Sequence, residues 1–69
     1  MSRQECQPAH AKLAPVQRYR DWLATLGKDH VVIKVPEHGG AYAMGYRFTT
    51  CERDELAEYI AGGATEVQP

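Results

Sequence analysis

The sequence predicts a small α+β domain in which a helix, a β-hairpin and a second helix follow one another, an αββα order. Two observations support this fold class. Between His30 and Thr50, apolar and polar residues alternate on both sides of a glycine-containing turn, which is typical of paired strands because successive side chains point to opposite faces. The flanking segments carry apolar residues at helical spacing. The simplest packing places both helices on one face of a two-stranded antiparallel sheet.

The first helix is predicted to run from Pro15 to Leu26. Proline is tolerated at the first helical position, and Gly27 suits the position just after the last turn. At about 100° per residue, the apolar side chains fall in one stripe. This stripe consists of Val16, Tyr19, Leu23 and Leu26, with Trp22 at its edge.

The hairpin is predicted to have its turn at residues 37–40, since Gly39 and Gly40 adopt tight-turn conformations at little cost. Strand alternation gives each strand an inner face, formed by Val31, Ile33 and Val35 on the first strand and by Tyr42, Met44, Tyr46 and Phe48 on the second. The outer face is expected to carry Val32 and Lys34 on one strand and Ala43, Gly45 and Arg47 on the other.

The second helix is predicted to begin at Thr49 or Thr50, because threonine is a favourable N-cap residue. Acidic residues follow in the first turn, where the helix dipole favours negative charge. The helix is expected to end at Gly62. We therefore expect one domain over residues 1–69, with an ordered core at 15–61 and flexible ends at 1–7 and 64–69.

Composition favours an intracellular protein. The net charge is −1, so no strong overall field attracts nucleic acid or an anionic membrane. No apolar run approaches the roughly 20 residues that a membrane span needs, and the first residues lack the apolar stretch of a secretory signal. Cys6 and Cys51 are therefore expected to be reduced thiols in a cytoplasm.

Metal and catalytic chemistry receive little support from the sequence. Cys51 is expected near a helix N-terminus, where the pKa of a thiol falls, but His38 as its base would lie at the opposite end of the second strand. We therefore expect no enzyme activity, no cofactor and no metal. The residue types that zinc prefers occur at spacings of no known finger or ribbon, at Cys6, His10, His30, His38 and Cys51.

A chain this small usually depends on disulfides, a metal or a partner chain for stability. The predicted sheet also consists of two edge strands, and a lone hairpin is only marginally stable in water. An edge strand can pair with a strand from another chain. We therefore expect a homodimer formed through a hairpin edge, or a tight complex with another protein.

The favoured function is a non-enzymatic protein-binding module, a dimeric inhibitor or adaptor that occludes a partner's surface. Small size, slight acidity and the lack of a catalytic motif are typical of inhibitors of host proteins encoded by phages or mobile elements. The candidate partner-binding residues are Trp22, Lys34, Glu37, His38, Tyr42 and Arg47. The alternative is a DNA- or RNA-binding accessory protein that uses Arg18, Arg20, Lys34 and Arg47.

Overall fold

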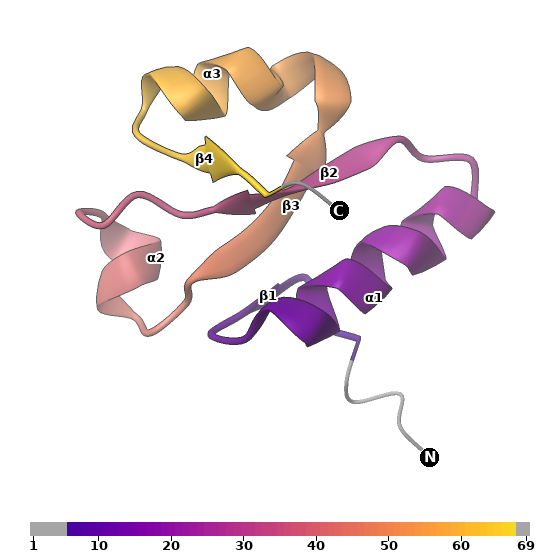
Figure 1. The fold of residues 1–69 in the computed structure, drawn as a ribbon, viewed down its shortest axis with the longest axis horizontal. Helices are drawn as coiled ribbons and strands as arrows, with labels where there is room; N and C mark the ends of the chain where they lie inside the picture. Colours follow the sequence, from indigo (N-terminus) through magenta and orange to yellow (C-terminus); the bar gives the residue numbers. More distant parts are fainter. Residues whose placement is uncertain (1–5, 68–69) are drawn as a thin grey trace.

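The structure is a computed structural model, and it describes residues 6–67. Two helices of more than one turn and a four-stranded sheet form a mixed α+β domain (Figure 1). In chain order the elements are β1 (Ala9–His10), α1 (Leu13–Thr25), β2 (His30–Lys34), α2 (Gly40–Ala43), β3 (Phe48–Glu52), the 3₁₀ turn η2 (Arg53–Glu55), α3 (Leu56–Ala61) and β4 (Thr65–Glu66).

The sheet has four antiparallel strands in the order β1-β3-β2-β4, so the predicted two-stranded αββα arrangement is wrong. The hairpin strands β2 and β3 form its centre, with Val31 opposite Cys51 and Ile33 opposite Thr49. Two short strands pair outside them, β1 on β3 and β4 on β2. The hairpin edges are therefore partly covered by the chain itself, and the premise of an edge-paired dimer, two open edges, is not met.

The first helix agrees with the prediction to within two residues: it begins at Leu13, two residues before Pro15, and ends at Thr25, one residue before Leu26. Pro15 lies in the first turn, where a backbone N–H has no helical acceptor, so it causes no break. Gly27 follows the last turn with φ +79°, and the Lys28 N–H donates to the Leu23 carbonyl at 3.1 Å. This is the backbone pattern of a glycine-terminated helix.

The second strand and the second helix both begin later than predicted. The strand begins at Phe48 rather than Ala41, because Gly40–Ala43 forms a helical turn and Gly45 has φ +99°. Thr49 and Thr50 are strand residues and cap no helix, since Thr50 pairs with Val32. β-branched threonine packs well in a sheet, and here pairing with β2 outweighs its N-cap preference.

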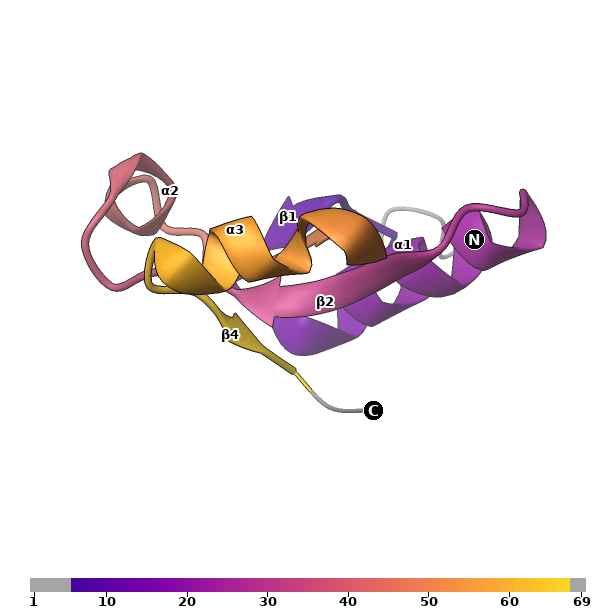
Figure 2. The same ribbon diagram turned by 90° about the horizontal axis from the view of Figure 1, so that it is seen from above.

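Helices cover both faces of the sheet, so the prediction that both helices share one face is wrong. One face carries a buried cluster of Val31, Ile33, Cys51 and Ala64, against which Leu56 of α3 packs. Val32 points to the opposite face. There α1 contacts β1, β2 and β3 and buries its own Val16 and Leu23. In Figure 2, α3 lies above β2 and the first part of α1 lies below it.

The predicted outer face of the hairpin is therefore only partly exposed to solvent. Val32 is only 1% exposed, because α1 covers it, whereas Lys34 at the end of β2 is exposed. Residues 64–67 belong to the segment that was expected to be a flexible tail. Ala64 is buried, β4 follows it, and the Val67 N–H donates to the Val32 carbonyl at 2.9 Å.

At the other end of the chain, the Gln7 N–H donates to the Pro15 carbonyl at 3.2 Å. Gln7, in the segment that was expected to be flexible, thus contacts α1 through this bond. The expectations for residues 1–5 and 68–69 fall outside the described residues.

Candidate functional site

The connection between β2 and β3, residues 36–47, forms a projection that we call the α2 loop. It lies at one end of the molecule, opposite the end at which α1 finishes (Figure 1). The Val35 N–H donates to the Arg47 carbonyl at 3.0 Å and closes the base of the loop. Most of its residues are exposed, including Met44 at 74% and Tyr46 at 37%. Large apolar side chains are thus presented to solvent on a projecting segment.

Backbone hydrogen bonds give the α2 loop a defined shape. Met44 donates to the Gly40 carbonyl at 3.0 Å, which completes the helical turn. Gly45 then donates to the Tyr42 carbonyl at 3.0 Å, and Tyr46 to the Ala41 carbonyl at 3.0 Å. This pair of bonds requires a left-handed residue after the helix, a position that Gly45 fills with φ +99°.

The Arg47 side chain fastens the loop from inside. Its Nη1 donates to the Tyr42 carbonyl at 3.0 Å and to the Tyr46 carbonyl at 2.8 Å. Its guanidinium carbon lies 3.7 Å from the centroid of the Tyr42 ring. Stacking of this kind contributes about 0.5–1 kcal/mol at exposed sites. Arg47 therefore holds both ends of the turn, and Met44 stays outside the contact.

Of the residues predicted to bind a partner, Glu37, His38, Tyr42 and Arg47 all belong to the α2 loop. The His38 ring also lies against the turn between α3 and β4, since a Cβ added at Gly63 would be 3.2 Å from His38 Nε2. The side-chain contacts of Arg47 described above lie within the loop, and the partner-contact role predicted for it stays a prediction.

The other two predicted residues lie outside the loop. Lys34 is exposed at the end of β2, next to the base of the loop. Trp22 is 49% exposed and belongs to the last part of α1, which Figure 1 places at the opposite end of the molecule from α2. The structure therefore does not bring Trp22 together with the others.

Sequence reasoning missed Met44 and Tyr46 as surface residues, because the alternating pattern assigned them to the inner face of a strand. The sequence nevertheless contains a signal for the observed conformation. Gly45 directly follows a run containing two alanines, Ala41 and Ala43, and glycine after a short helical segment is a common stop.

The basic residues proposed for nucleic-acid binding are not gathered into one surface. Arg18 and Arg20 are two positions apart on α1, so they point in different directions. Arg20 is paired with Asp21 at 3.0 Å, and Arg47 is used within the α2 loop. Lys34 alone remains near the loop base. A continuous basic footprint, which such binding needs, is not formed by these residues.

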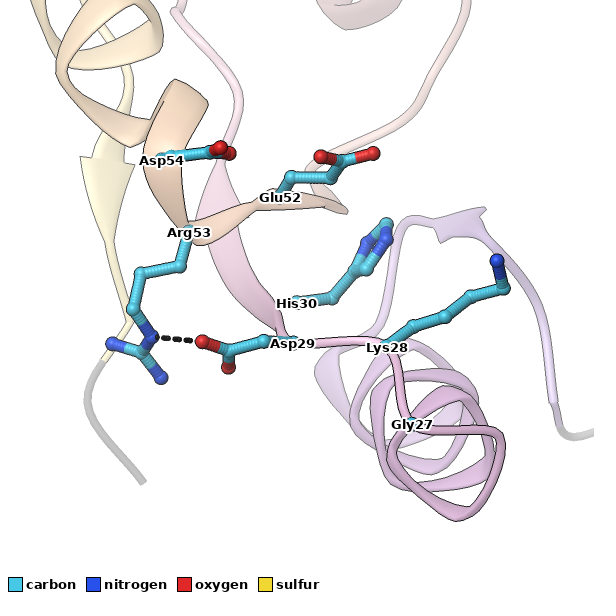
Figure 3. A pocket seen from close by; sticks show the side chains of 7 residues that line it. All are labelled: Gly27, Lys28, Asp29, His30, Glu52, Arg53 and Asp54. Carbon is cyan, nitrogen blue, oxygen red and sulfur yellow. Dashed lines mark hydrogen bonds and ion pairs between the residues drawn. The ribbon is translucent and has the colours of Figure 1, made fainter.

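A charged hollow of about 470 Å³ lies where the link between α1 and β2 faces the end of β3 (Figure 3). Arg53 Nε donates to Asp29 Oδ2 at 2.8 Å across it. This bond lowers the pKa of the Asp29 carboxyl and raises the pKa of Arg53. Lys28, Glu52 and Asp54 also line the hollow. Charges of both signs thus share one open site, which gives it no clear preference for anions or cations.

The structure also describes the residues whose side chains are of the types that zinc binds. Cys51 lies in β3 and not at a helix N-terminus, and it is only 3% exposed. Burial, together with the nearby Glu55 and Glu66 carboxylates, raises the pKa of its thiol, contrary to the lowered pKa expected from the sequence. Within residues 6–67, no three His, Cys, Asp or Glu side chains are grouped as metal ligands.

Comparison of the chain with protein-family models, with curated proteins and with solved structures found no match. Among the described residues, the helices are too short or too polar to cross a membrane.

Proposed function

We propose that this chain is a non-enzymatic protein-binding module that uses the α2 loop to cover part of a partner's surface, as an inhibitor or an adaptor. The observation that carries the proposal is Met44, which is 74% exposed on a loop whose shape is held by internal hydrogen bonds. An exposed apolar group on a fixed scaffold loses little conformational freedom on binding.

Residue chemistry in the loop supports the same proposal. Tyrosine, methionine and arginine are enriched at protein interfaces, and Tyr42, Met44, Tyr46 and Arg47 occur together here. Lys34, Glu37 and His38, which lie in the loop or next to its base, are exposed polar residues. An apolar centre with a polar rim is the usual composition of such a contact surface.

The alternatives receive less support. The α2 loop projects from the fold (Figure 1), whereas catalysis and small-ligand binding need an enclosing pocket. The main argument for a homodimer was that both hairpin edges are open. That argument is weakened, because β1 and β4 pair with those edges. We therefore propose a complex with a different protein, and a cytoplasmic location remains a prediction.

Capture from a cell lysate tests the proposal with three immobilised proteins: the wild type, Met44→Glu and Leu26→Glu. Leu26 is the matched control, since it is 54% exposed but lies at the end of α1. A true partner is captured by the wild type and by Leu26→Glu, and about tenfold less by Met44→Glu, because a charge is then buried against an apolar surface.

Circular dichroism and thermal melting verify that both variants fold. Partners that bind Met44→Glu as well as the wild type would exclude the α2 loop as the contact surface. Partners lost only with Leu26→Glu would move the site to α1.

A further inference from the structure

Strand β1 is a short cover over the outer edge of β3. It is two residues long, and it places His10 opposite Phe48. The Arg47 N–H donates to the His10 carbonyl at 3.1 Å, and the Thr49 hydroxyl donates to the Pro8 carbonyl at 2.9 Å. Because so few bonds hold β1 on β3, a small change in free energy alters how often it detaches.

The turn from β1 into α1 contains a hydrogen bond that depends on the charge of a histidine. The N–H of Lys12, the N-cap residue of α1, donates to Nδ1 of His10 at 2.9 Å. A backbone N–H only donates, so Nδ1 is the unprotonated nitrogen of a neutral imidazole and Nε2 carries the proton. Asparagine and aspartate side chains accept in the same way from the N–H two residues on.

Protonation of His10 removes this acceptor. Both ring nitrogens of an imidazolium are donors, so a proton on Nδ1 would point at the Lys12 N–H, and the half-buried ring has to leave its place in the turn. The same residue supplies the carbonyl that accepts from the Arg47 N–H. Movement of His10 therefore weakens the hold of β1 on β3.

The charged groups around His10 offer an imidazolium no partner among the described residues. β1 packs against β3 and α1. The charged residues nearest to it are Arg47, which precedes Phe48, Lys34, which lies opposite Phe48 on β2, and Lys12 in the turn. The other titratable or charged residues of β3 and α1 lie farther along these elements, namely Cys51 and Glu52 at the other end of β3, and Arg18, Tyr19, Arg20 and Asp21 on later turns of α1. Charged His10 thus has cations at the neighbouring positions.

We propose that β1 is a pH-sensitive strap, which stays on β3 while His10 is neutral and detaches more often once His10 is protonated. Because the Lys12 N–H needs the neutral ring, lowering the pH shifts the balance toward detachment. Release opens the outer edge of β3 at Phe48 and Thr49, and an open strand edge is where another extended chain can pair.

Hydrogen exchange at the Arg47 amide measures how often β1 detaches, since this N–H donates to the His10 carbonyl. Nuclear magnetic resonance follows the exchange at about pH 5 and about pH 7.5, on either side of the range in which histidine changes its charge. Each rate is divided by that of an unstructured peptide at the same pH. The protection of Arg47 in the wild type should fall about fivefold in acid, the effect of losing one hydrogen bond. The protection of Val31, at the centre of the sheet, should stay unchanged.

Two variants separate the charge of His10 from its hydrogen bond. His10→Asn keeps an acceptor for the Lys12 N–H that does not titrate, so the protection of Arg47 should be the same at both pH values. His10→Ala has no acceptor, so protection should be low at both. His38→Asn, on the exposed α2 loop, is the matched control and should keep the wild-type pH dependence. The comparison of the wild type at two pH values does not depend on the stability of any variant.

A long-range ¹H–¹⁵N spectrum of the His10 ring gives a direct reading, with the proton expected on Nε2 at the higher pH. A proton on Nδ1 would overturn the inference. So would equal protection of Arg47 in the wild type at both pH values, the wild-type fall in His10→Asn, or an equal fall at Val31, which would mean that the whole fold loosens. Because Met44 takes no part in the strap, none of these results bears on the function proposed for the α2 loop.

Discussion

The Arg47 guanidinium stacks on the Tyr42 ring at 3.7 Å and at the same time donates to the Tyr42 carbonyl at 3.0 Å. One side chain thus holds both the ring and the backbone of the residue five positions before it. Because Arg47 also donates to the Tyr46 carbonyl at 2.8 Å, the contact closes the α2 loop over its helical turn. The shape of the proposed binding surface therefore depends on a residue that sequence reasoning treated as a contact residue.

Replacing Arg47 by lysine tests this dependence. Lysine keeps the positive charge but has no planar group that can stack on the ring and donate to both carbonyls. We expect a loss of about 0.5–1.5 kcal/mol in the free energy of unfolding, the value of a stacking contact and a hydrogen bond. Amide hydrogen exchange should accelerate at Tyr46 and remain unchanged at Val31. An equal acceleration at both amides would mean that Arg47 supports the whole fold rather than the loop.

Gly45 and Gly39 form a matched pair for testing the backbone of the α2 loop. Gly45 has φ +99°, which a side chain disfavours, whereas Gly39 is extended at φ −179°, and neither site has atoms within 4 Å of an added Cβ. Gly45→Ala should therefore destabilise the protein by about 1–2 kcal/mol. Gly39→Ala should change stability by less than about 0.5 kcal/mol. Urea unfolding of both variants measures the difference, and equal effects would contradict the left-handed conformation at Gly45.

The packing of α1 against the second face of the sheet is tested at Val32. This side chain is 1% exposed, and its truncation to alanine removes two methyl groups and leaves a cavity. We expect a loss of about 2 kcal/mol in the free energy of unfolding. Leu26→Ala, at a position that is 54% exposed, should cost less than about 0.5 kcal/mol. If Val32 faced solvent, as the sequence pattern predicted, both substitutions would be nearly neutral.

The Val32 case also explains why the fold was only partly predictable. The consecutive Val31, Val32 and Ile33 are all buried, which is typical of a strand covered on both faces. The alternation analysis considered one face alone, so both helices were assigned to the same side. The first helix was predicted well because its apolar stripe and Gly27 are local signals. Pairing of β1 and β4 with the hairpin arises from tertiary contacts, and two-residue strands leave no period to detect.

The candidate site was likewise only partly predictable from the sequence. Turn residues such as Glu37 and His38 were identified because glycines mark the turn. Met44 was assigned to the core, since alternation over residues 42–48 satisfies a strand pattern although Gly45 breaks the strand. The edge of β2 was expected to pair with another chain, whereas in the described residues β4 pairs with it, because the chain returns to this edge after α3.

The Asp29–Arg53 pair predicts a pH dependence of stability. The pKa of Asp29 is lowered in the folded protein, mainly by its hydrogen bond from Arg53. Its contribution is therefore present above the ordinary carboxyl pKa and is lost as the pH falls through the folded-state pKa. Asp29→Asn should lower the urea midpoint slightly at neutral pH and low salt. The difference should vanish in acid, and it should shrink in high salt because both side chains are exposed. A difference that persists in acid would assign the effect to another interaction.

The two cysteines should differ strongly in reactivity in the folded state. Cys51 is 3% exposed, and burial raises the pKa of its thiol, so both access and thiolate formation are unfavourable. Cys6 is half-buried. Iodoacetamide at neutral pH should therefore modify Cys6 at least about 100-fold faster than Cys51, as the fraction of molecules open at β3 is small. Mass spectrometry of peptides after timed quenching measures the two rates, and the same reaction in urea is the control, where the rates should become similar. The raised pKa also means that the buried neutral thiol favours the folded state until the pH exceeds the pKa of an unfolded thiol, above which stability should fall. Rapid modification of Cys51 in the folded protein would contradict its burial in the cluster with Val31 and Ala64, against which Leu56 packs.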